Sequence, residues 1–240
     1  VVVIDPGHPE WAVGLNFIEA RGPDRRRQVA CLVNEMVKIF ESLYDMRVVG
    51  GPMFEQYMRN SLLLLLLTTD YRRATLLDVN RVFEDAAFRR DLLSRCPDPI
   101  VSSFWKRQAE KAGGEATLNN MAPYVTSKLN QFVTNPFLRP ILGQVESTLD
   151  FREVMDRRRI LLVNLSKGEL GRFDSQLLGM LIMGRLLLAG FSRSDVPMEQ
   201  RVPFSVFVDE FQNFTTDTVA QALSEARKYG LSLTLANQTL

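Results

Sequence analysis

The sequence predicts an α/β protein in which a mainly parallel sheet is combined with an inserted all-α domain. Short apolar runs that are typical of strands stand near both ends of the chain, at residues 1–4, 160–165, 204–208 and 231–236. The segments between the last three runs have helical spacing, and such strand–helix alternation implies parallel strands joined by right-handed crossovers. Residues 24–157 have helical apolar spacing nearly throughout. We therefore assign residues 1–23 and 158–240 to the sheet-containing core and residues 24–157 to the insertion.

The predicted strands are followed by polar residues that could belong to a ligand-binding site. Val1–Ile4 ends at Asp5, whose carboxylate either belongs to a ligand site or forms a turn before proline. Ile160–Leu165 and Phe204–Val208 are nearly continuous apolar runs, which are typical of strands buried on both faces of a parallel sheet. Polar residues follow each of these runs, so chemistry is expected at the carboxyl ends of the strands.

The helices of the insertion are predicted from apolar stripes and from residues that can cap the first turn. Four aromatic residues, Phe104, Trp105, Tyr124 and Phe132, fall at core spacing, and we expect them to pack inside rather than to stack on bases. The expected helices are one capped by Asp24 that reaches Tyr44, Glu55–Thr68, one opened by a capping box of Thr75 and Asp78, Asp85–Ser94, Ile100–Lys111, Thr117–Thr134, and Leu149–Arg157 after a capping box of Ser147 and Asp150.

Two helices are expected to connect the last three strands. Asp174 is predicted to cap a long apolar helix, and Thr215 or Thr216 to cap another that reaches Tyr229. Gly230 follows as the left-handed residue that commonly ends a helix.

Composition excludes several classes of function. The chain has 240 residues, of which 46% are hydrophobic and 24% charged, as in ordinary globular domains. The net charge of +1 gives no general attraction to a polyanion, so any DNA contact must come from local patches.

The single histidine, His8, and the cysteines Cys31 and Cys96 lack metal-ligand spacing, which argues against a zinc site. Two cysteines without a disulfide framework fit a reducing cytoplasm. The longest wholly apolar run, Leu62–Leu67, is far shorter than a membrane span and predicts a buried helix.

The most informative stretch is Pro203–Phe214, PFSVFVDEFQNF, in which an apolar strand ends in Asp209 and Glu210. In a nucleotide hydrolase, a Walker B motif lies at this place. The aspartate holds Mg²⁺, usually through a water, and the glutamate accepts a proton from the water that attacks the γ-phosphate. The alternative is a strand that simply enters a solvated loop, because short motifs also match by chance.

Two other residues could complete such a site. Gln238 follows the last strand, where its amide could contact the γ-phosphate and the attacking water, or could only form a turn. Arg227 lies near the carboxyl end of the preceding helix. There it either interacts with the helix dipole or reaches across a subunit boundary as an arginine finger.

A phosphate-binding loop is missing from the sequence. No G-x-x-x-x-G-K-[ST] pattern occurs in the 240 residues, and without it the phosphates of ATP have no cradle. We therefore expect that such a loop precedes Val1, or else that the domain does not bind ATP. The chain begins without methionine in a strand-like run and ends just beyond another, so we interpret it as part of a longer protein and expect it to be inactive alone.

Several motifs together resemble a known superfamily. VFVDEFQNF, SEARKYGLSLTLANQ and RRRILLVNLSKGELG are similar to the FtsK/HerA superfamily of P-loop motors, and within it to the type IV secretion and conjugative DNA-transfer ATPases. The opening VVVIDPGHPEWAVGLNFIE resembles the strand that follows the P-loop region in these proteins. The resemblance extends over most of the chain and is strongest from Arg157 onward.

The resemblance implies a RecA-like P-loop ATPase core with an inserted all-α domain, assembled as a ring that is commonly a hexamer. It implies ATP and Mg²⁺ as cofactors, with Asp209 as the Mg²⁺ residue, Glu210 as the catalytic base and Gln238 as the γ-phosphate sensor that contacts ATP. Arg227 matches the trans-acting arginine finger. DNA and type IV secretion components are the implied partners. The implied location is the cytoplasm, at the cytoplasmic face of the inner membrane, with membrane contact only through segments outside these residues.

We therefore expect an ATP-hydrolysing ring motor that translocates DNA. A secretion-type ATPase that energises protein export or pilus assembly without DNA is the first alternative, and the near-neutral charge is compatible with it. A scaffold subunit that keeps the fold without hydrolysis is the second. A scaffold has no need for Asp209, Glu210, Arg227 and Gln238 together, so it ranks last.

Overall fold

The structure is a computed structural model. It describes all residues except 21–24, 45–50, 110–114, 217–218, 220–223 and 238–240. Its contacts divide the chain into two compact units. One consists of Val1–Val13, Lys38–Leu43 and Thr148–Leu240, and we call it the sheet unit. The other consists of Gly14–Val37 and Tyr44–Ser147, and we call it the helical unit. The division into a core of residues 1–23 and 158–240 and an insertion of residues 24–157 stays a prediction.

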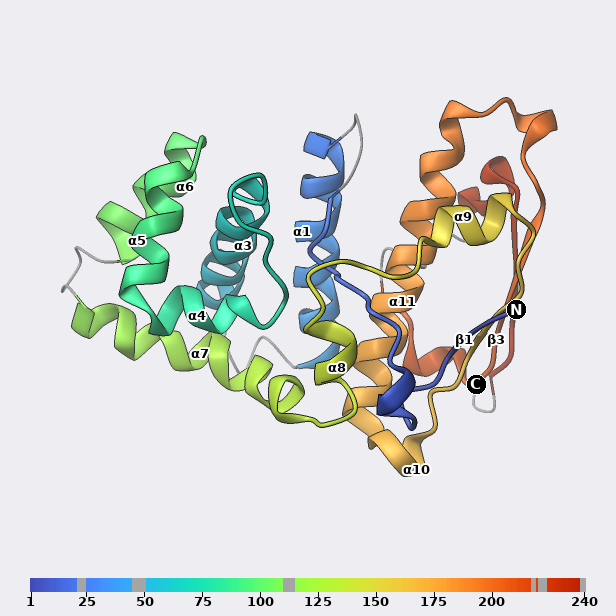
Figure 1. The fold of residues 1–240 in the computed structure, drawn as a ribbon, viewed down its shortest axis with the longest axis horizontal. Helices are drawn as coiled ribbons and strands as arrows, with labels where there is room; N and C mark the ends of the chain where they lie inside the picture. Colours follow the sequence, from blue (N-terminus) through green and yellow to red (C-terminus); the bar gives the residue numbers. More distant parts are fainter. Residues whose placement is uncertain (21–24, 45–50, 110–114, 217–218, 220–223, 238–240) are drawn as a thin grey trace. The chain divides into compact units, whose positions relative to one another are not determined.

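The helical unit is built from helices joined by short loops (Figure 1). Helix α1 contributes residues to both units. The bounds are α1 Arg25–Leu43, α3 Gly51–Leu67, α4 Asp78–Glu84, α5 Ala86–Arg95, α6 Pro99–Ser103, the π-helix η2 Phe104–Ala109, α7 Glu115–Thr134 and α8 Arg139–Leu142.

Several predicted helix boundaries are confirmed, and others are wrong. The Thr75 backbone N–H donates to the Asp78 carboxylate at 2.9 Å, which is half of the predicted capping box, but α4 begins only at Asp78 and Thr75 does not cap it. Asp85 caps α5 by accepting from the backbone N–H of Phe88. The helix expected at Glu55–Thr68 begins earlier, at Gly51, and ends at Leu67. The predicted cap Asp24 lies outside the described residues.

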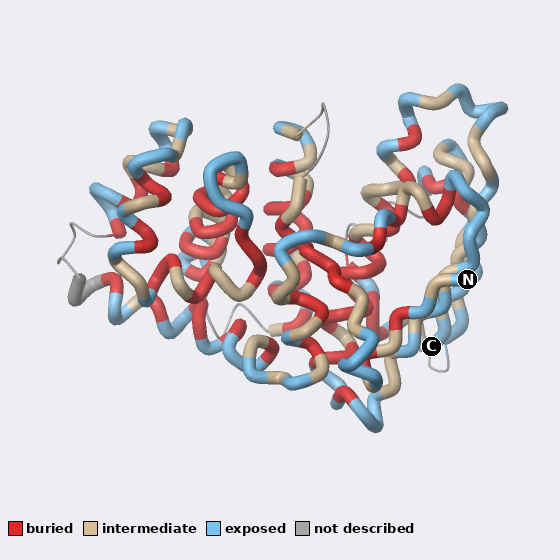
Figure 2. The backbone as a smooth tube through the Cα atoms, in the orientation of Figure 1, coloured by how far each residue is buried: buried red, intermediate tan, exposed pale blue. Residues whose placement is uncertain are grey.

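The core of the helical unit is aromatic and aliphatic. Phe104, Trp105 and Phe132 are buried as predicted, whereas Tyr124 is 47% exposed, so its assignment to the core was wrong. The rings of Phe104 and Trp105 meet edge to face with centroids 5.3 Å apart, a favourable arrangement for aromatic pairs. The predicted buried run lies in α3, where buried leucines line the helix (Figure 2).

Lys128 is an unusual member of this core. Its ammonium group donates to the backbone carbonyl of Tyr124 at 2.5 Å and lies 5.1 Å from the centroid of the Phe54 ring. Burial lowers the pKa of Lys128, because removal from water disfavours the charged form. The folded state therefore holds this proton less tightly than the unfolded chain does. The resulting cost to stability is present below the folded pKa and disappears as the pH rises through it toward the unfolded pKa.

We expect Lys128→Met to raise the midpoint of thermal unfolding by a few degrees at pH 7, because it removes the cost of burying the charge and keeps the apolar stem. The difference between variant and wild type should shrink as the pH approaches about 10.4, the pKa of an unperturbed lysine. Thermal unfolding followed by circular dichroism at both pH values checks this. A difference that does not change with pH would contradict the electrostatic explanation.

The sheet unit contains two parallel strand pairs (Figure 1). β1 pairs with β2, with Val2 opposite Leu161, and β3 pairs with β4, with Phe204 opposite Leu231. The mixed α/β class with parallel strands is thus confirmed, while the complete RecA-like core stays a prediction, because each sheet has only two strands among the described residues. The bounds are β1 Val2–Ile4, η1 Pro9–Trp11, α9 Phe151–Asp156, β2 Leu161–Val163, α10 Lys167–Leu170, α11 Arg172–Ser192, η3 Arg193–Asp195, η4 Met198–Gln200, β3 Phe204–Val208, η5 Phe211–Asn213, η6 Ala226–Tyr229 and β4 Leu231–Leu235.

The strands are less buried than their apolar sequences predicted. In β3, partly buried residues alternate with exposed ones, and Phe207 is 76% exposed. Leu162 of β2 is 53% exposed. A parallel strand is buried on both sides only where helices cover both faces of the sheet. In β4, Leu231 is buried beside Gly190 of α11, while Ser232 and Thr234 on the other face of the strand are exposed.

Two predicted helix caps in the sheet unit are also corrected. The cap of α9 is Asp150, which accepts from the backbone N–H groups of Arg152 and Glu153. Ser147, predicted to share a capping box with it, instead accepts a hydrogen bond from the Asn16 backbone N–H. Asp174 does not cap α11, because the helix begins at Arg172 and Asp174 lies buried in its first turn.

Helix α11 is the central helix of the sheet unit. Among the described residues, Arg172–Asp195 is the one helical stretch long and apolar enough to cross a membrane. However, 67% of its most apolar window is buried inside the protein, as in the core helix of a globular domain. The backbone of α11 approaches its neighbours closely at Gly179 and Gly190, where a methyl group would meet Phe214 and Leu231, respectively.

Gly179→Ala is expected to destabilise the sheet unit. The new Cβ would lie 2.3 Å from Cδ1 of Phe214, a buried ring that follows the Asp209–Glu210 step by four residues, so this ring must move. Overpacking of this kind costs about 1–3 kcal/mol. Chemical denaturation monitors the loss. Gly168→Ala is the control, because its new Cβ meets no atom closer than 3.8 Å and should leave stability unchanged. Equal stability of the two variants would contradict the packing argument.

Candidate functional site

The carboxyl end of β3 carries Asp209 and Glu210, and the end of β4 lies beside it. Val208 is opposite Leu235 in the parallel register. Pairing continues past both strands, because the Ala236 N–H donates to the Val208 carbonyl at 2.9 Å and the Phe211 N–H donates to the Ala236 carbonyl at 3.0 Å. The residues that follow β3 and β4 therefore lie at one edge of the strand pair, the edge at which open α/β sheets bind ligands.

Glu210 has an uncommon backbone conformation. Its φ of 51° and ψ of 41° lie in the left-handed region, which costs a non-glycine residue about 1–2 kcal/mol. The conformation is held by Asn213, whose backbone and side-chain N–H groups both donate to the Glu210 carbonyl. The Glu210 carboxylate accepts from Nε2 of Gln212 at 2.8 Å. This turn directs the chain away from the strand immediately after the carboxylate pair.

Asp209 is exposed at the same edge. One of its carboxylate oxygens accepts from the Glu210 backbone N–H at 2.9 Å, which fixes the side chain relative to the turn. The described residues contain no cluster of three or more His, Cys, Asp or Glu side chains able to hold a metal ion. A lone exposed carboxylate fits Mg²⁺, since this ion keeps several waters and takes its remaining ligands from substrate phosphates.

Lys167 reaches the same edge and was missed in the sequence. It is the first residue of α10, just after β2, and its Nζ lies 3.8 Å from Oε2 of Glu210. The sequence did contain a signal for Lys167, because this residue closely follows a strand. Polar residues that follow parallel strands tend to lie at the same edge of the sheet.

Asp5 forms a turn, which is one of the two interpretations that its position allowed. Its carboxylate accepts from the Gly7 backbone N–H at 3.1 Å and from Nδ2 of Asn164 at 3.2 Å. Because β1 and β2 are parallel, Asp5 and Asn164 follow their strands at the same level. These contacts join the ends of the two strands.

Arg227 lies at the other end of the β3–β4 pair. It is exposed on the short 3₁₀ helix η6, which precedes β4, and Gly230 ends this helix in the predicted left-handed conformation with a φ of 72°. The five residues of β3 separate this end from the carboxylates by roughly 16 Å. The structure therefore brings Asp209 and Glu210 together but does not bring Arg227 to them within one chain. Gln238 lies outside the described residues.

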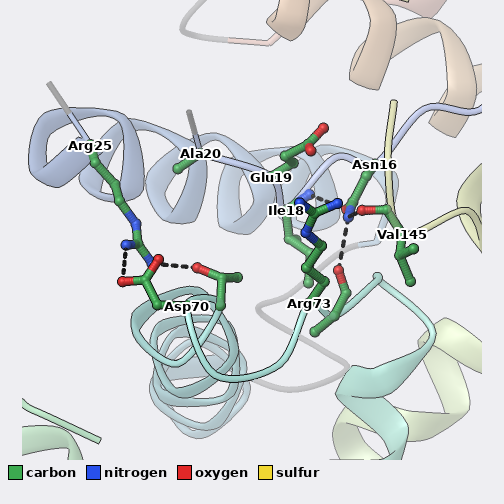
Figure 3. A pocket seen from close by; sticks show the side chains of 10 residues that line it. Asn16, Ile18, Glu19, Ala20, Arg25, Asp70, Arg73 and Val145 are labelled. Carbon is green, nitrogen blue, oxygen red and sulfur yellow. Dashed lines mark hydrogen bonds and ion pairs between the residues drawn. The ribbon is translucent and has the colours of Figure 1, made fainter. Parts of the chain in front are cut away.

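A pocket of about 440 Å³ lies elsewhere, in the helical unit (Figure 3). Its charged residues already have partners, since Arg25 pairs with Asp70 and Arg73 with Glu146. Asn16 is buried beside it and donates to the backbone carbonyls of Ala74 and Val145. These contacts hold the connecting loops in place, and we assign the pocket no chemistry.

Comparison with known proteins gives a likeness in fold. No protein-family model and no curated protein matches this chain. Solved structures with a similar fold include the bacterial conjugative coupling protein TrwBdeltaN70 in its unbound monoclinic form, with a TM-score of 0.59 and 15% sequence identity. The similarity covers 98% of this chain and 50% of that one, so this chain spans about half of that length. At this identity the likeness shows the fold alone: the chain is similar in fold to half of a bacterial conjugative coupling protein.

Proposed function

We propose that this chain is part of an ATP-hydrolysing motor that moves DNA, as in conjugative transfer. The observation that carries the proposal is the pair Asp209 and Glu210 at the carboxyl end of β3, beside the end of β4, in a chain whose fold resembles a conjugative coupling protein. A strand that merely enters a loop needs no left-handed glutamate at its end. Backbone conformations of this kind cluster at active sites.

The proposed roles follow from the chemistry of each group. Glu210 accepts the proton of the attacking water, and Asp209 holds Mg²⁺ through water ligands. The bound ion would neutralise charge on the phosphates. Lys167 forms an ion pair with Glu210, with Nζ 3.8 Å from the carboxylate oxygen Oε2, and is proposed to help orient this side chain. Gln238 is proposed as the γ-phosphate sensor. The proposal requires a phosphate-binding loop from outside these 240 residues.

Arg227 is proposed to act on a neighbouring subunit of a ring, which we propose to be a hexamer. Its distance from its own Asp209–Glu210 edge supports this, because a finger needed in the same chain would have to lie near that edge. We further propose a cytoplasmic location, with type IV secretion components as partners. The alternative of a secretion-type ATPase that works without DNA is supported by the net charge of only +1.

The deciding measurement is ATP hydrolysis by the full-length protein with and without double-stranded DNA. A DNA motor should hydrolyse ATP several times faster with DNA. The stimulation should fall steeply between about 50 and 200 mM salt, since phosphate contacts release counterions. Hydrolysis that is indifferent to DNA would support the secretion-type ATPase. Absence of hydrolysis under all conditions would overturn both and leave the scaffold.

A further inference from the structure

The turn that carries Arg227 is fixed to the rest of the sheet unit by another arginine. Arg201 follows η4, and its Nη1 donates to the backbone carbonyl of Lys228, the residue next to Arg227. Its Nε donates to the Val196 carbonyl at 2.8 Å. The Arg201 guanidinium also lies 5.8 Å from the ring centroid of Tyr229, within the range of a cation–π interaction.

The opposite side of the turn is held by packing and by the sheet. The Tyr229 ring meets Phe191 of α11 edge to face, with centroids 4.9 Å apart. The Gly230 carbonyl accepts from the Phe204 N–H at 2.9 Å, which joins the turn to the first residue of β3. Arg227 itself is exposed. The backbone around this side chain is therefore anchored at several points, while its guanidinium is presented to solvent.

Arg201 is in turn supported by a charge network around one buried arginine, Arg193. Arg193 has a side chain only 1% exposed and donates through Nη2 to the carbonyl of Val202, the residue after Arg201. Its Nε lies 3.2 Å from the carboxylate of Asp156, which also pairs with Arg152 at 2.5 Å. Burying a guanidinium is costly unless it is paired. The ion pair with Asp156 offsets part of this cost, and the hydrogen bond to Val202 holds the backbone next to Arg201.

We propose that Arg201 is a positioning residue that sets the direction in which Arg227 is presented to a neighbouring subunit's ATP. The inference rests on the proposed function, because Arg227 has a phosphate to reach only in a ring that hydrolyses ATP. Arg201 does not touch the nucleotide. It acts through the backbone of Lys228 and the ring of Tyr229. The guanidinium is needed because its rigid fork donates to two carbonyls at once, which a lysine ammonium cannot do with the same geometry.

The test compares Arg201→Met, Arg227→Ala and the double variant in the full-length protein. Methionine keeps an unbranched stem against Tyr229 but removes both hydrogen bonds. We expect Arg201→Met to lower kcat for ATP about 10- to 100-fold with little change in KM, since small displacements of a catalytic group cost this much. The double variant should be no slower than Arg227→Ala alone, because Arg201 acts only through Arg227. Arg201→Lys should recover at most part of the activity.

Arg157→Met is the matched control. Arg157 is an exposed arginine of the sheet unit whose side chain pairs with Glu153 of its own segment at 3.1 Å, and its loss should leave kcat unchanged. If Arg201 had a merely structural role, Arg201→Met would slow the Arg227→Ala protein by the same factor by which it slows the wild-type protein. That result would overturn the inference. Wild-type hydrolysis that is lost in Arg227→Ala but kept in Arg201→Met would overturn the inference and leave the proposed function intact. Failure of the wild type to hydrolyse ATP would overturn both.

Discussion

Glu210→Gln is expected to lower ATP hydrolysis by the full-length protein by about 100-fold or more while nucleotide binding is kept. The reason is that general-base catalysis contributes about 10²- to 10⁴-fold, and the amide cannot accept the proton of the attacking water. Glutamine has the same shape and can keep the hydrogen bond to Gln212. The measurement is steady-state turnover together with equilibrium binding of a labelled ATP analogue. Normal turnover in this variant would show that the base lies elsewhere.

Two further variants separate the catalytic role of Glu210 from a structural one. Glu199→Gln is the matched control, because Glu199 is exposed on η4 and precedes β3, at the end away from the proposed site. Glu210→Gly relieves the left-handed strain and should stabilise the unit by about 1 kcal/mol while abolishing hydrolysis. A gain in stability with a loss of activity is the signature of strain kept for function. If Glu210 were only a turn residue, glycine would raise stability and leave turnover unchanged.

What the sequence predicted well are features encoded locally. The strand Phe204–Val208 and the strand beginning at Leu231 are where their apolar runs placed them, and Gly230 has the left-handed conformation expected of a helix end. Parallel pairing followed from strand–helix alternation. Each of these depends on a few neighbouring residues. Consequently they can be identified without knowledge of the tertiary contacts.

What the sequence did not predict depends on contacts between distant segments. Arg201 and Lys228 are 27 residues apart, and nothing in the spacing of either indicates that one holds the backbone of the other. Lys167 reaches Glu210 only because the start of α10 lies near the turn that follows β3. The exposure of Phe207 depends on which face of its strand is covered by the rest of the chain, and an apolar run cannot predict this. Of these missed features, Lys167 lies at the candidate site itself.

Arg227→Ala is expected to lower ATP hydrolysis by about 10³-fold or more with nucleotide binding retained, since an arginine finger stabilises charge that develops only in the transition state. Lys228→Ala is the matched control. Its side chain is an exposed cation of the same turn that pairs only loosely with Glu225, at 3.8 Å, and its backbone carbonyl is unaffected by the substitution. If Arg227 served instead to interact with the helix end, the variant would lose thermal stability and keep its turnover.

Mixing the two inactive variants tests whether Arg227 acts across a subunit boundary. A ring assembled from Glu210→Gln and Arg227→Ala subunits contains some interfaces at which an intact Glu210 meets an intact Arg227 from the neighbour. Such interfaces can hydrolyse ATP only if the two residues serve one ATP from different chains. The location of the two residues at opposite ends of the β3–β4 pair supports this arrangement. Co-assembled variants should therefore recover measurable hydrolysis, although each alone is nearly inactive. If both residues acted within one chain, every subunit in the mixture would lack one of them, and no activity would return at any mixing ratio.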